Sequence, residues 1–282
     1  MGKFTDLKKE DGTMPRAKLQ QKLDELAPFH HRVDLPHGLT TCLDLHVRHD
    51  RERTRLDSLL AHLWPRLLEL YGGSLNGKRV LDVACNCGGF SVRAAESGAK
   101  EVLGVDSEAH YIDQANFIRD ALQLPNVRFE VAKLQDITAK RHGKFDIIFF
   151  FGILYHLEDP IGALRRMSAV ANDVMIVDTT LLRLPYINRF VRLPLWRMRL
   201  VEPIEEDSCD FTTGLWRKRR SCQFYPNRTA VEEALKFVGF DEVDMLEPNE
   251  EGLEQRYYQG KRATFIARRS LRPCSQSLKG VG

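Results

Sequence analysis

Short apolar runs alternate with helical stretches between residues 78 and 180, and this alternation predicts a parallel β-sheet with crossover helices. Asp159 followed by Pro160 predicts the start of one such helix, and Ser107 predicts the N-cap of another. The region is therefore expected to fold as a doubly wound α/β sheet. Its predicted parallel strands are Arg79–Val83, Glu101–Val105, Val127–Val131, Phe145–Phe150 and Val174–Val177.

The segments on either side of this sheet follow different patterns. Leucines at helical spacing between Arg51 and Tyr71 predict a helix packed on the main domain. A helix near residues 229–238 and strands near 242–246 and 262–267 are expected to complete the sheet. We accordingly divide the chain into an N-terminal leader and helical segment (1–74), a core (75–181), a basic insertion (182–225), a C-terminal completion of the core (226–270) and a flexible tail (271–282).

The composition is that of a globular protein, since 43% of the 282 residues are hydrophobic and 29% are charged. A formal net charge of +3 is far below that of a dedicated nucleic-acid binder, although a local basic patch can still bind RNA. No run approaches the roughly 18 apolar residues that a membrane-spanning helix needs, and the charged N-terminus is unlike a signal peptide. We therefore expect a cytoplasmic protein without a transmembrane segment. The sequence gives no indication of the oligomeric state.

Cysteine and histidine spacing argues against disulfides and metal. The six cysteines form neither a dense framework nor CxxC pairs, so we expect reduced thiols. His30, His31, His46 and His49 lack cysteine or carboxylate partners at metal-binding spacing, so no metal site is expected.

One strand, Arg79–Val83, runs directly into a turn of small residues before the next helix. In open α/β sheets ligands bind at the carboxyl ends of the strands, where the first βα turn presents free N–H groups. Gly88 and Gly89 lack the Cβ that would block a ligand, so Gly88→Val is expected to abolish binding and leave the fold intact. Asp106 follows 18 positions after Gly88, where a carboxylate can accept hydrogen bonds from ribose hydroxyls.

Two nucleotide-bearing cofactors fit such a turn. A dinucleotide presents a doubly charged pyrophosphate and favours three glycines spread as GxGxxG, whereas S-adenosylmethionine presents an amino acid and a sulfonium. Here Ala84 and Asn86 stand where glycines are usual, and the small residues are crowded together. The turn therefore favours S-adenosylmethionine, with a nicotinamide dehydrogenase as the competing interpretation.

The run from Val80 to Gly89, with Asp106 and the run from Phe151 to Pro160, resembles the class I S-adenosylmethionine-dependent methyltransferases. More narrowly, it resembles the bacterial tRNA wobble-uridine carboxymethyltransferases and their uncharacterised relatives. That family ends its fourth strand in Gly-x-Leu-Tyr-His and carries Lys-Arg-Ala before its last strand, as residues 152–156 and 261–263 do here. The similarity covers residues 75–180 well and 220–268 more loosely. It implies a Rossmann-like sheet of seven strands, the last one antiparallel.

The resemblance also implies roles for single residues. Leu134 and Gln135 would flank the adenine, Phe151 would lie along the cofactor, and Tyr155 would lie near the transferred group as a catalytic residue. Arg262 would bind substrate, facing the carboxylate of carboxy-S-adenosylmethionine. The other residues that we expect at the cofactor are Asp82, Ala84, Asn86, Gly88, Asp106, Ser107 and Glu108.

The sequence departs from the family before the core. The family places a lysine for that same carboxylate in a Pro-aromatic-Arg-Lys-Gly stretch, where residues 28–32 of this chain have no lysine and His31 takes its position. The family's tryptophan-rich segment is also missing, since residues 39–55 contain no tryptophan. Because one cation is lost, we predict that plain S-adenosylmethionine binds at least as tightly as its carboxylated form.

Two further features have more than one interpretation. His156 is the candidate general base, or it packs beside the helix that starts at Asp159. The stretch from Leu182 to Leu200 has five arginines and no acid, and we interpret it as a lid helix over the active site. Contact with a membrane surface or with an anionic substrate is the alternative for this stretch.

Taken together, these patterns predict a methyltransferase that uses S-adenosylmethionine and transfers a methyl group to an unidentified acceptor, which is a small molecule or a tRNA. Carboxymethyl transfer from carboxy-S-adenosylmethionine to a tRNA wobble uridine is one alternative. A module that binds the cofactor without catalysis is another.

Overall fold

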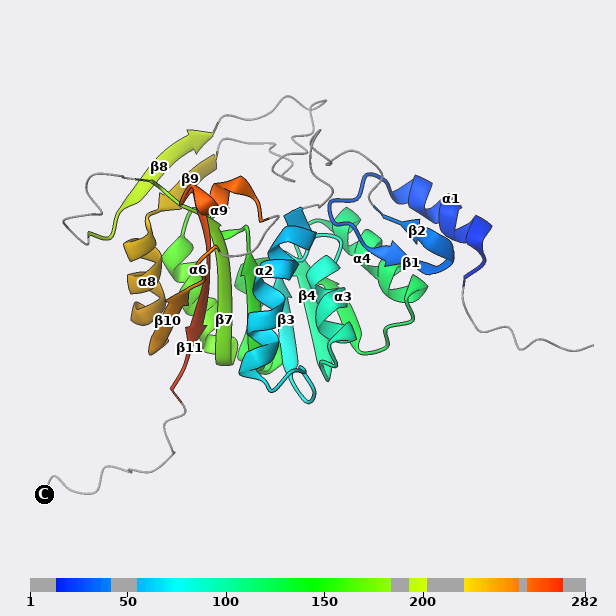
Figure 1. Cartoon of the computed structure of the whole chain (residues 1–282), viewed down its shortest axis with the longest axis horizontal. Helices are drawn as coiled ribbons and strands as arrows, with labels where there is room; N and C mark the ends of the chain where they lie inside the picture. Colours follow the sequence, from blue (N-terminus) through cyan, green and yellow to red (C-terminus); the bar gives the residue numbers. More distant parts are fainter. Residues whose placement is uncertain (1–13, 42–54, 184–192, 202–220, 249–252, 271–282) are drawn as a thin grey trace, which may run out of the picture.

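Seven strands form the central sheet, in the order β10-β11-β7-β6-β3-β4-β5 (Figure 1). The computed structural model of the chain describes residues 14–41, 55–183, 193–201, 221–248 and 253–270. Neighbouring strands from β5 to β7 run parallel, and β11 runs antiparallel to both β7 and β10. The predicted doubly wound sheet with an antiparallel last strand is confirmed. The strands are β3 (Arg79–Val83), β4 (Glu101–Asp106), β5 (Val127–Val131), β6 (Phe145–Phe151), β7 (Ala171–Thr180), β10 (Glu242–Met245) and β11 (Arg262–Arg268).

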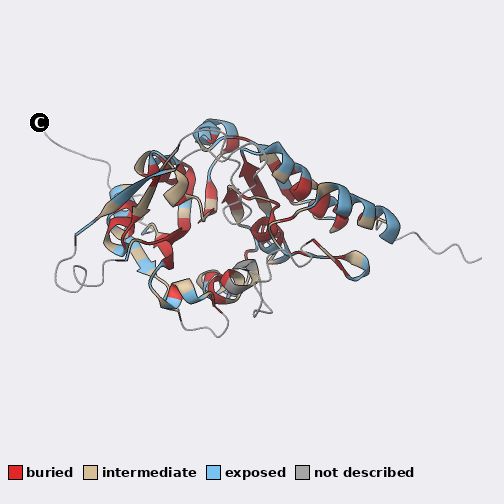
Figure 2. Ribbon diagram, turned by 90° about the horizontal axis from the view of Figure 1, so that it is seen from above, coloured by how far each residue is buried: buried red, intermediate tan, exposed pale blue. Residues whose placement is uncertain are grey.

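Helices cover both faces of this sheet. Side chains of β3 alternate between the faces, so that Val80 packs in one apolar core and Leu81 in the other. The first core contains residues of α2 (Arg55–Leu70), α3 (Gly89–Glu96) and α4 (Ala109–Ala121). The second contains residues of α6 (Pro160–Val170) and α8 (Arg228–Phe237). Figure 2 shows that the buried sides of the helices face inward and their exposed sides face solvent. The short helices are α5 (Ala139–His142), α9 (Gln255–Tyr258), η1 (Pro36–Gly38), η2 (Leu134–Asp136) and η3 (Leu154–His156).

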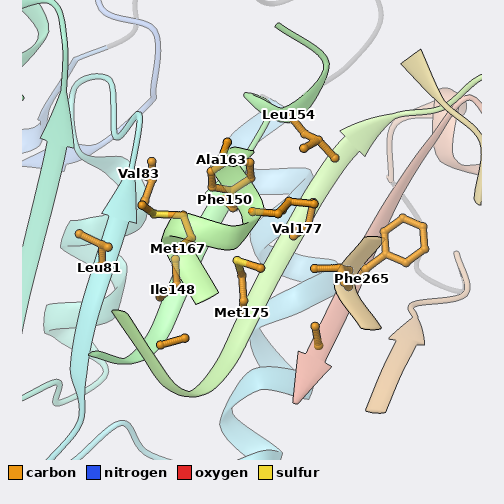
Figure 3. Packing of buried hydrophobic residues seen from close by; sticks show 14 of the residues in the cluster. Leu81, Val83, Ile148, Phe150, Leu154, Ala163, Met167, Met175, Val177 and Phe265 are labelled. Carbon is orange, nitrogen blue, oxygen red and sulfur yellow. The ribbon is translucent and has the colours of Figure 1, made fainter. Parts of the chain in front are cut away.

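The second core covers one face of the sheet from β4 to β11. Phe150, Val177 and Phe265 lie on neighbouring strands, and Met167 of α6 belongs to the same core (Figure 3). All four side chains are fully buried. Burying a side chain of this size stabilises the fold by about 1.5–3 kcal/mol, so this packing holds α6 on the sheet.

The N-terminal segment packs outside the sheet, on α4. It comprises α1 (Arg16–Leu26) and a small pair of strands, β1 (Asp34–Leu35) and β2 (Leu39–Thr40). Its Leu19 and Phe29 join the Phe117 side of α4 in a third apolar core. The buried Gln114 of α4 donates from its side-chain nitrogen to the carbonyl oxygens of Leu26 at 2.6 Å and Pro28 at 2.8 Å. These two hydrogen bonds hold the stretch that leads to His30 and His31.

A separate two-stranded ribbon lies at the end of the sheet near α9 (Figure 1). It consists of β8 (Trp196–Val201) paired antiparallel with β9 (Ser221–Pro226). The prediction of a helix for the whole stretch from Leu182 to Leu200 is therefore wrong at β8, where apolar and basic residues alternate with the period of a strand. Residues 184–192 and 202–220 of the basic insertion lie outside the described residues, so a lid or a membrane contact there stays a prediction.

Two predicted helix starts had different outcomes. Asp159 is confirmed as the N-cap of α6, because its side chain accepts a hydrogen bond from the Gly162 amide. Ser107 is not the N-cap of α4, since Glu108 occupies that position. The backbone amide of Glu108 donates to the carboxylate of Asp106, and this shifts the start of the helix by one residue. Among the residues that the structure describes, no helix is long and apolar enough to cross a membrane.

We predict that Gln114→Met releases the N-terminal segment while the sheet stays folded. The substitution keeps the side-chain volume but leaves two carbonyl oxygens without their donor, at a cost of about 1–3 kcal/mol. Hydrogen exchange should show faster exchange of α1 amides and unchanged exchange of β3 and β6. Gln21→Met, on the exposed side of α1, is the matched control. Equal protection of α1 in both variants would contradict the assignment.

Candidate functional site

A cavity opens at the carboxyl ends of the central parallel strands. Its lining includes Ala84 after β3, Asp106 at the end of β4 and Phe151 at the end of β6. Open α/β sheets bind ligands in this position. Of the other predicted site residues, the cavity lining includes Asn86, Ser107, Glu108, Leu134, Tyr155, His156 and Arg262.

The loop between β3 and α3 turns sharply because left-handed residues alternate along it. Ala84, Asn86 and Gly88 have φ angles of 56°, 52° and 81°. Two of these residues carry a Cβ, and the left-handed region costs such residues roughly 1–2 kcal/mol. Asn86 offsets part of this cost, since its side-chain oxygen accepts from the Cys87 amide at 2.7 Å. The loop keeps the backbone conformation of a glycine-rich turn with fewer glycines.

The Asp106 carboxylate fixes this loop. It accepts hydrogen bonds from the backbone amides of Asn86 at 3.0 Å and Glu108 at 3.1 Å, one on each oxygen. Burial is the main cause that raises the pKa of the Asp106 carboxyl, and these amides act in the opposite direction. Each carboxylate oxygen has a second lone pair. Asp106 can therefore accept further hydrogen bonds from a ligand in the cavity.

Asp82 lies behind the loop and is not among the cavity-lining residues. Its carboxylate is 2% exposed and accepts a hydrogen bond from the Ser91 hydroxyl at 2.7 Å. Burial raises the pKa of the Asp82 carboxyl to about 7. The side chain ties β3 to α3 and supports the turn from below.

Gly88 also supports the turn, and the expected effect of Gly88→Val needs correction. A Cβ at Gly88 would lie 2.6 Å from the ring of Phe129 and 3.3 Å from Ala115, so it would point into the core between α4 and β5. The position also requires a φ of +81°. Valine there would disrupt the fold, so the prediction that it blocks the ligand and leaves the fold intact is wrong.

Of the two residues expected to flank the adenine, one lines the cavity. Leu134 lines the cavity, but the neighbouring Gln135 is exposed and does not. Phe151 lines the cavity with its ring 4.5 Å from the ring of Phe90 and stacked on Phe149 at 5.1 Å. These aromatic contacts hold Phe151 in a single orientation.

Tyr155 and His156 lie in η3 and are held by β9. The hydroxyl of Tyr225 donates to the side-chain oxygen of Gln223 at 2.7 Å, so the amide nitrogen of Gln223 faces His156 Nδ1 at 2.9 Å. With Nδ1 as the acceptor, a neutral His156 carries its proton on Nε2. Tyr155 stacks on Tyr225 with ring centroids 5.7 Å apart. This network favours His156 as a hydrogen-bond donor rather than as a general base.

Arg262 lies at the base of the cavity and is 1% exposed. Its Nη2 pairs with the Asp178 carboxylate, and its Nε donates to the Tyr257 hydroxyl at 3.1 Å. Tyr257 and Thr264 donate to the same carboxylate. Burial lowers the pKa of the Arg262 guanidinium, but Asp178 outweighs it, so the net shift is upward. Among the residues that the structure describes, Nη1 has no hydrogen-bond partner, so its N–H groups are free to bind a ligand.

The prediction of site residues missed the contribution of the N-terminal segment. His31 lines the cavity, its Nδ1 accepts from the Gly89 amide at 3.1 Å, and its own amide donates to Cys87 Sγ. The amide of Gly89, at the start of α3, is therefore hydrogen-bonded to the imidazole. No local pattern in the sequence indicates this contact, because it joins residues 58 positions apart. Among the described residues, no three His, Cys, Asp or Glu side chains are grouped as a metal site requires.

Comparison with known proteins gives a consistent result. Residues 74–184 match the family model of a methyltransferase domain. The tRNA U34 carboxymethyltransferase of Aliarcobacter butzleri is 25% identical over 175 residues, which are 61% of this chain and 50% of that protein. The enzyme of the same name from Campylobacter hominis is 32% identical over 111 residues, or 37% of this chain and 38% of that protein. The chain thus spans about half or less of the length of these curated relatives.

Solved structures share the fold. The N-terminal domain of EvdMO1 with SAH bound superposes with a TM-score of 0.66 at 16% identity, covering 93% of this chain and all of that domain (100%). The S-adenosylmethionine dependent methyltransferase from Mesorhizobium loti gives a TM-score of 0.51 at 21% identity, covering 76% of this chain and 100% of that one. The chain has the class I methyltransferase fold, its residues 74–184 match a methyltransferase domain, and it is similar to part of the tRNA U34 carboxymethyltransferases, as the sequence predicted.

Substitution of Asn86 tests the left-handed loop. Both Asn86→Ala and Asn86→Gly lose the hydrogen bond to the Cys87 amide, but only glycine adopts a φ of 52° without strain. We predict that the alanine variant is less stable than the glycine variant by about 1 kcal/mol. Chemical denaturation measures this difference. Equal stability of the two variants would mean that the loop relaxes.

Asp82 should make the stability of the fold depend on pH. The pKa of its carboxyl is about 7 in the folded chain and about 3.9 in an unfolded one, so the folded state binds more protons between these values. The free energy of unfolding should therefore fall as pH rises from about 5 to about 7, by about 1 kcal/mol per pH unit relative to Asp82→Asn. Asp120→Asn, at an exposed position, should follow the wild type. Parallel curves for the wild type and Asp82→Asn would contradict this.

Proposed function

We propose that this chain is a methyltransferase that uses S-adenosylmethionine and methylates an acceptor not yet identified. The observation that carries this proposal is the Asp106 carboxylate, which ends β4 at the cavity and bonds the amide of Asn86 in the left-handed loop. A carboxylate held at this point can accept hydrogen bonds from the two hydroxyls of a ribose. The methyltransferase-domain match and the shared fold support the same conclusion.

The residues of the cavity fit the parts of this cofactor. Asp106 would hold the ribose, Leu134 would contact the adenine, and the backbone of the loop after β3 would approach the amino acid portion. When bound, the cofactor supplies an electrophilic methyl group on a sulfonium. The chain then has to orient an acceptor in line with that group, which needs positioning more than proton transfer. Tyr155 and His156, held by β9, are the residues proposed to do this.

The cavity offers a poor site for a second carboxylate. The positive charge of Arg262 is already paired with Asp178, and of its three nitrogens only Nη1 is left without a hydrogen-bond partner among the described residues. His31 accepts a hydrogen bond from Gly89 through Nδ1 and so contributes no charge in this state. A buried anion is tolerated when it is paired and fully hydrogen-bonded. We therefore favour methyl transfer from plain S-adenosylmethionine over carboxymethyl transfer.

The nicotinamide alternative rests on the same fold and the same acidic residue. The loop lacks the spread glycines that accommodate a pyrophosphate, and the relatives named above are carboxymethyltransferases rather than dehydrogenases. Asp106 alone does not separate the two cofactors, so binding has to be measured with each of them.

Asp106→Ala should weaken binding of S-adenosylmethionine by about 1.5–3 kcal/mol, the scale of hydrogen bonds to a charged group. Calorimetry measures this change. Asp120→Ala, an aspartate at the far end of α4, is the control and should bind as the wild type does. A melting temperature within a few degrees of the wild type would show that the loss is not caused by unfolding. Unchanged affinity would remove Asp106 from the site.

The choice between the two forms of the cofactor calls for Arg262→Lys rather than Arg262→Ala. Alanine would leave Asp178 as an unpaired buried charge, at a cost of about 3–5 kcal/mol. Lysine keeps a positive charge for Asp178 and removes the donors at Nη1 together with the hydrogen bond from Nε to Tyr257. In side-by-side titrations, we predict that the wild type binds plain S-adenosylmethionine at least as tightly as carboxy-S-adenosylmethionine. An about tenfold preference for the carboxylated form that is lost in Arg262→Lys would favour a carboxymethyltransferase.

A further inference from the structure

A second pocket, lined by basic side chains, lies beside the cavity. It opens where β7 ends and where β8 and β9 meet α9. We call it the cationic pocket. The residues that line it are Thr180, Leu181, Leu182, Arg183, Arg197, Arg199, Tyr225, Arg256 and Lys261.

Few acidic side chains of the described residues pair with the positive charges of this pocket. Of its basic residues, Arg256 has a hydrogen bond and an ion pair: it donates to the Thr180 hydroxyl at 3.0 Å and lies 3.9 Å from the Glu254 carboxylate. The other four basic residues form no ion pair with any acidic residue that the structure describes. Gathering like charges costs free energy, and the cost is relieved when an anion binds among them. The pocket is therefore suited to an anionic group.

Two of the arginines belong to the two-stranded ribbon. Arg197 and Arg199 are two residues apart in β8, so they lie on the same face of the ribbon, opposite Tyr225 and Gln223 of β9. The ribbon is anchored by the fully buried Asn227. Its side chain accepts from the Leu195 amide at 3.0 Å and donates to the Leu193 carbonyl at 2.7 Å.

The same face of the ribbon reaches the cavity. Tyr225 lines the cationic pocket and also stacks on Tyr155, which lines the cavity. Gln223, opposite Arg199, bonds His156. The pair of Tyr155 and Tyr225 thus forms the wall between the two pockets. A molecule with an anionic group among the arginines would have its neighbouring atoms next to Tyr155.

We propose that the cationic pocket binds a phosphate group of the acceptor and that this contact presents the acceptor's nucleophile at Tyr155. The assignment rests on the proposed methyltransferase function. A phosphate suits this set of residues better than a carboxylate, because it carries up to two charges and several oxygens for the forked donors of arginine. The group belongs either to a phosphorylated small molecule or to the backbone of an RNA.

Direct binding measurements test the proposal without any turnover. The variant is Arg197→Gln with Arg199→Gln, which keeps side-chain length and polarity but removes both charges. The matched control is Arg66→Gln with Arg128→Gln, whose side chains are 56% and 58% exposed and lie away from both pockets. The probes are inorganic pyrophosphate, a nucleoside 5′-monophosphate, the unphosphorylated nucleoside and a single-stranded RNA of mixed sequence.

We expect the wild type and the control to bind pyrophosphate and the monophosphate, and the Arg197/Arg199 variant to bind them at least about tenfold more weakly, a difference of about 1.4 kcal/mol. The unphosphorylated nucleoside should bind equally weakly to all three proteins. RNA that binds far more tightly than the monophosphate, with a steep salt dependence lost in the variant, would identify the backbone phosphate as the source. Equal affinity of RNA and monophosphate would identify a phosphorylated small molecule.

Three results would overturn the proposal. The first is equal phosphate binding by the Arg197/Arg199 variant and the control, and the second is no phosphate binding by the wild type. The third is binding to vesicles that contain phosphatidylserine without binding to any soluble phosphate, which would assign the basic residues to a membrane surface. Calorimetry with S-adenosylmethionine on the same samples tests the proposed function separately. A wild type that does not bind the cofactor would reject the function. The phosphate titrations alone decide whether the cationic pocket binds phosphate.

Discussion

The hydrogen bond between the Asp106 carboxylate and the Asn86 amide is the interaction on which the site depends. It joins the end of β4 to the loop after β3, and both residues line the cavity. The loop needs this support because Ala84 and Asn86 adopt left-handed conformations that their side chains disfavour. Asp82 and Gly88 contribute from behind, through Ser91 and through close packing on Phe129. The same carboxylate that holds the loop keeps lone pairs for a ligand.

A second constraint shapes the opposite wall. Arg262 and Asp178 form a buried ion pair at the junction of β11 with β7, and Tyr257 and Thr264 donate further hydrogen bonds to the Asp178 carboxylate. Such additional hydrogen bonds offset part of the cost of burying the two charges. Just outside this pair, the chain leaves β7 toward the ribbon of β8 and β9. The same face of the ribbon carries Tyr225, which stacks on Tyr155, and the arginines of the cationic pocket. Methyl transfer and recognition of a phosphorylated acceptor are in this account properties of one continuous surface.

Much of the fold could be predicted from the sequence because buried parallel strands are short apolar runs. Arg79–Val83 and Val127–Val131 have the predicted bounds, whereas β7 is longer than predicted, since Asp178, Thr179 and Thr180 are polar yet buried through pairing with β11. Trp196, Met198 and Leu200 alternate with other residues, as in a strand. The arginines nearby instead favour the predicted helix, whose basic face would be exposed to solvent. The surroundings of Gly88, His31 and Arg262 depend on contacts between distant segments, which no local pattern encodes.

The most direct test of the account is a competition experiment on the purified chain. The protein is incubated with equal amounts of S-adenosylmethionine, carboxy-S-adenosylmethionine and NAD, exchanged into volatile buffer, and weighed intact by native mass spectrometry. We predict a complex with one molecule of S-adenosylmethionine, at least as abundant as any complex with the carboxylated form, and no complex with NAD. A dominant complex with NAD, or no bound cofactor of any kind, would contradict the assignment of the Asp106 cavity.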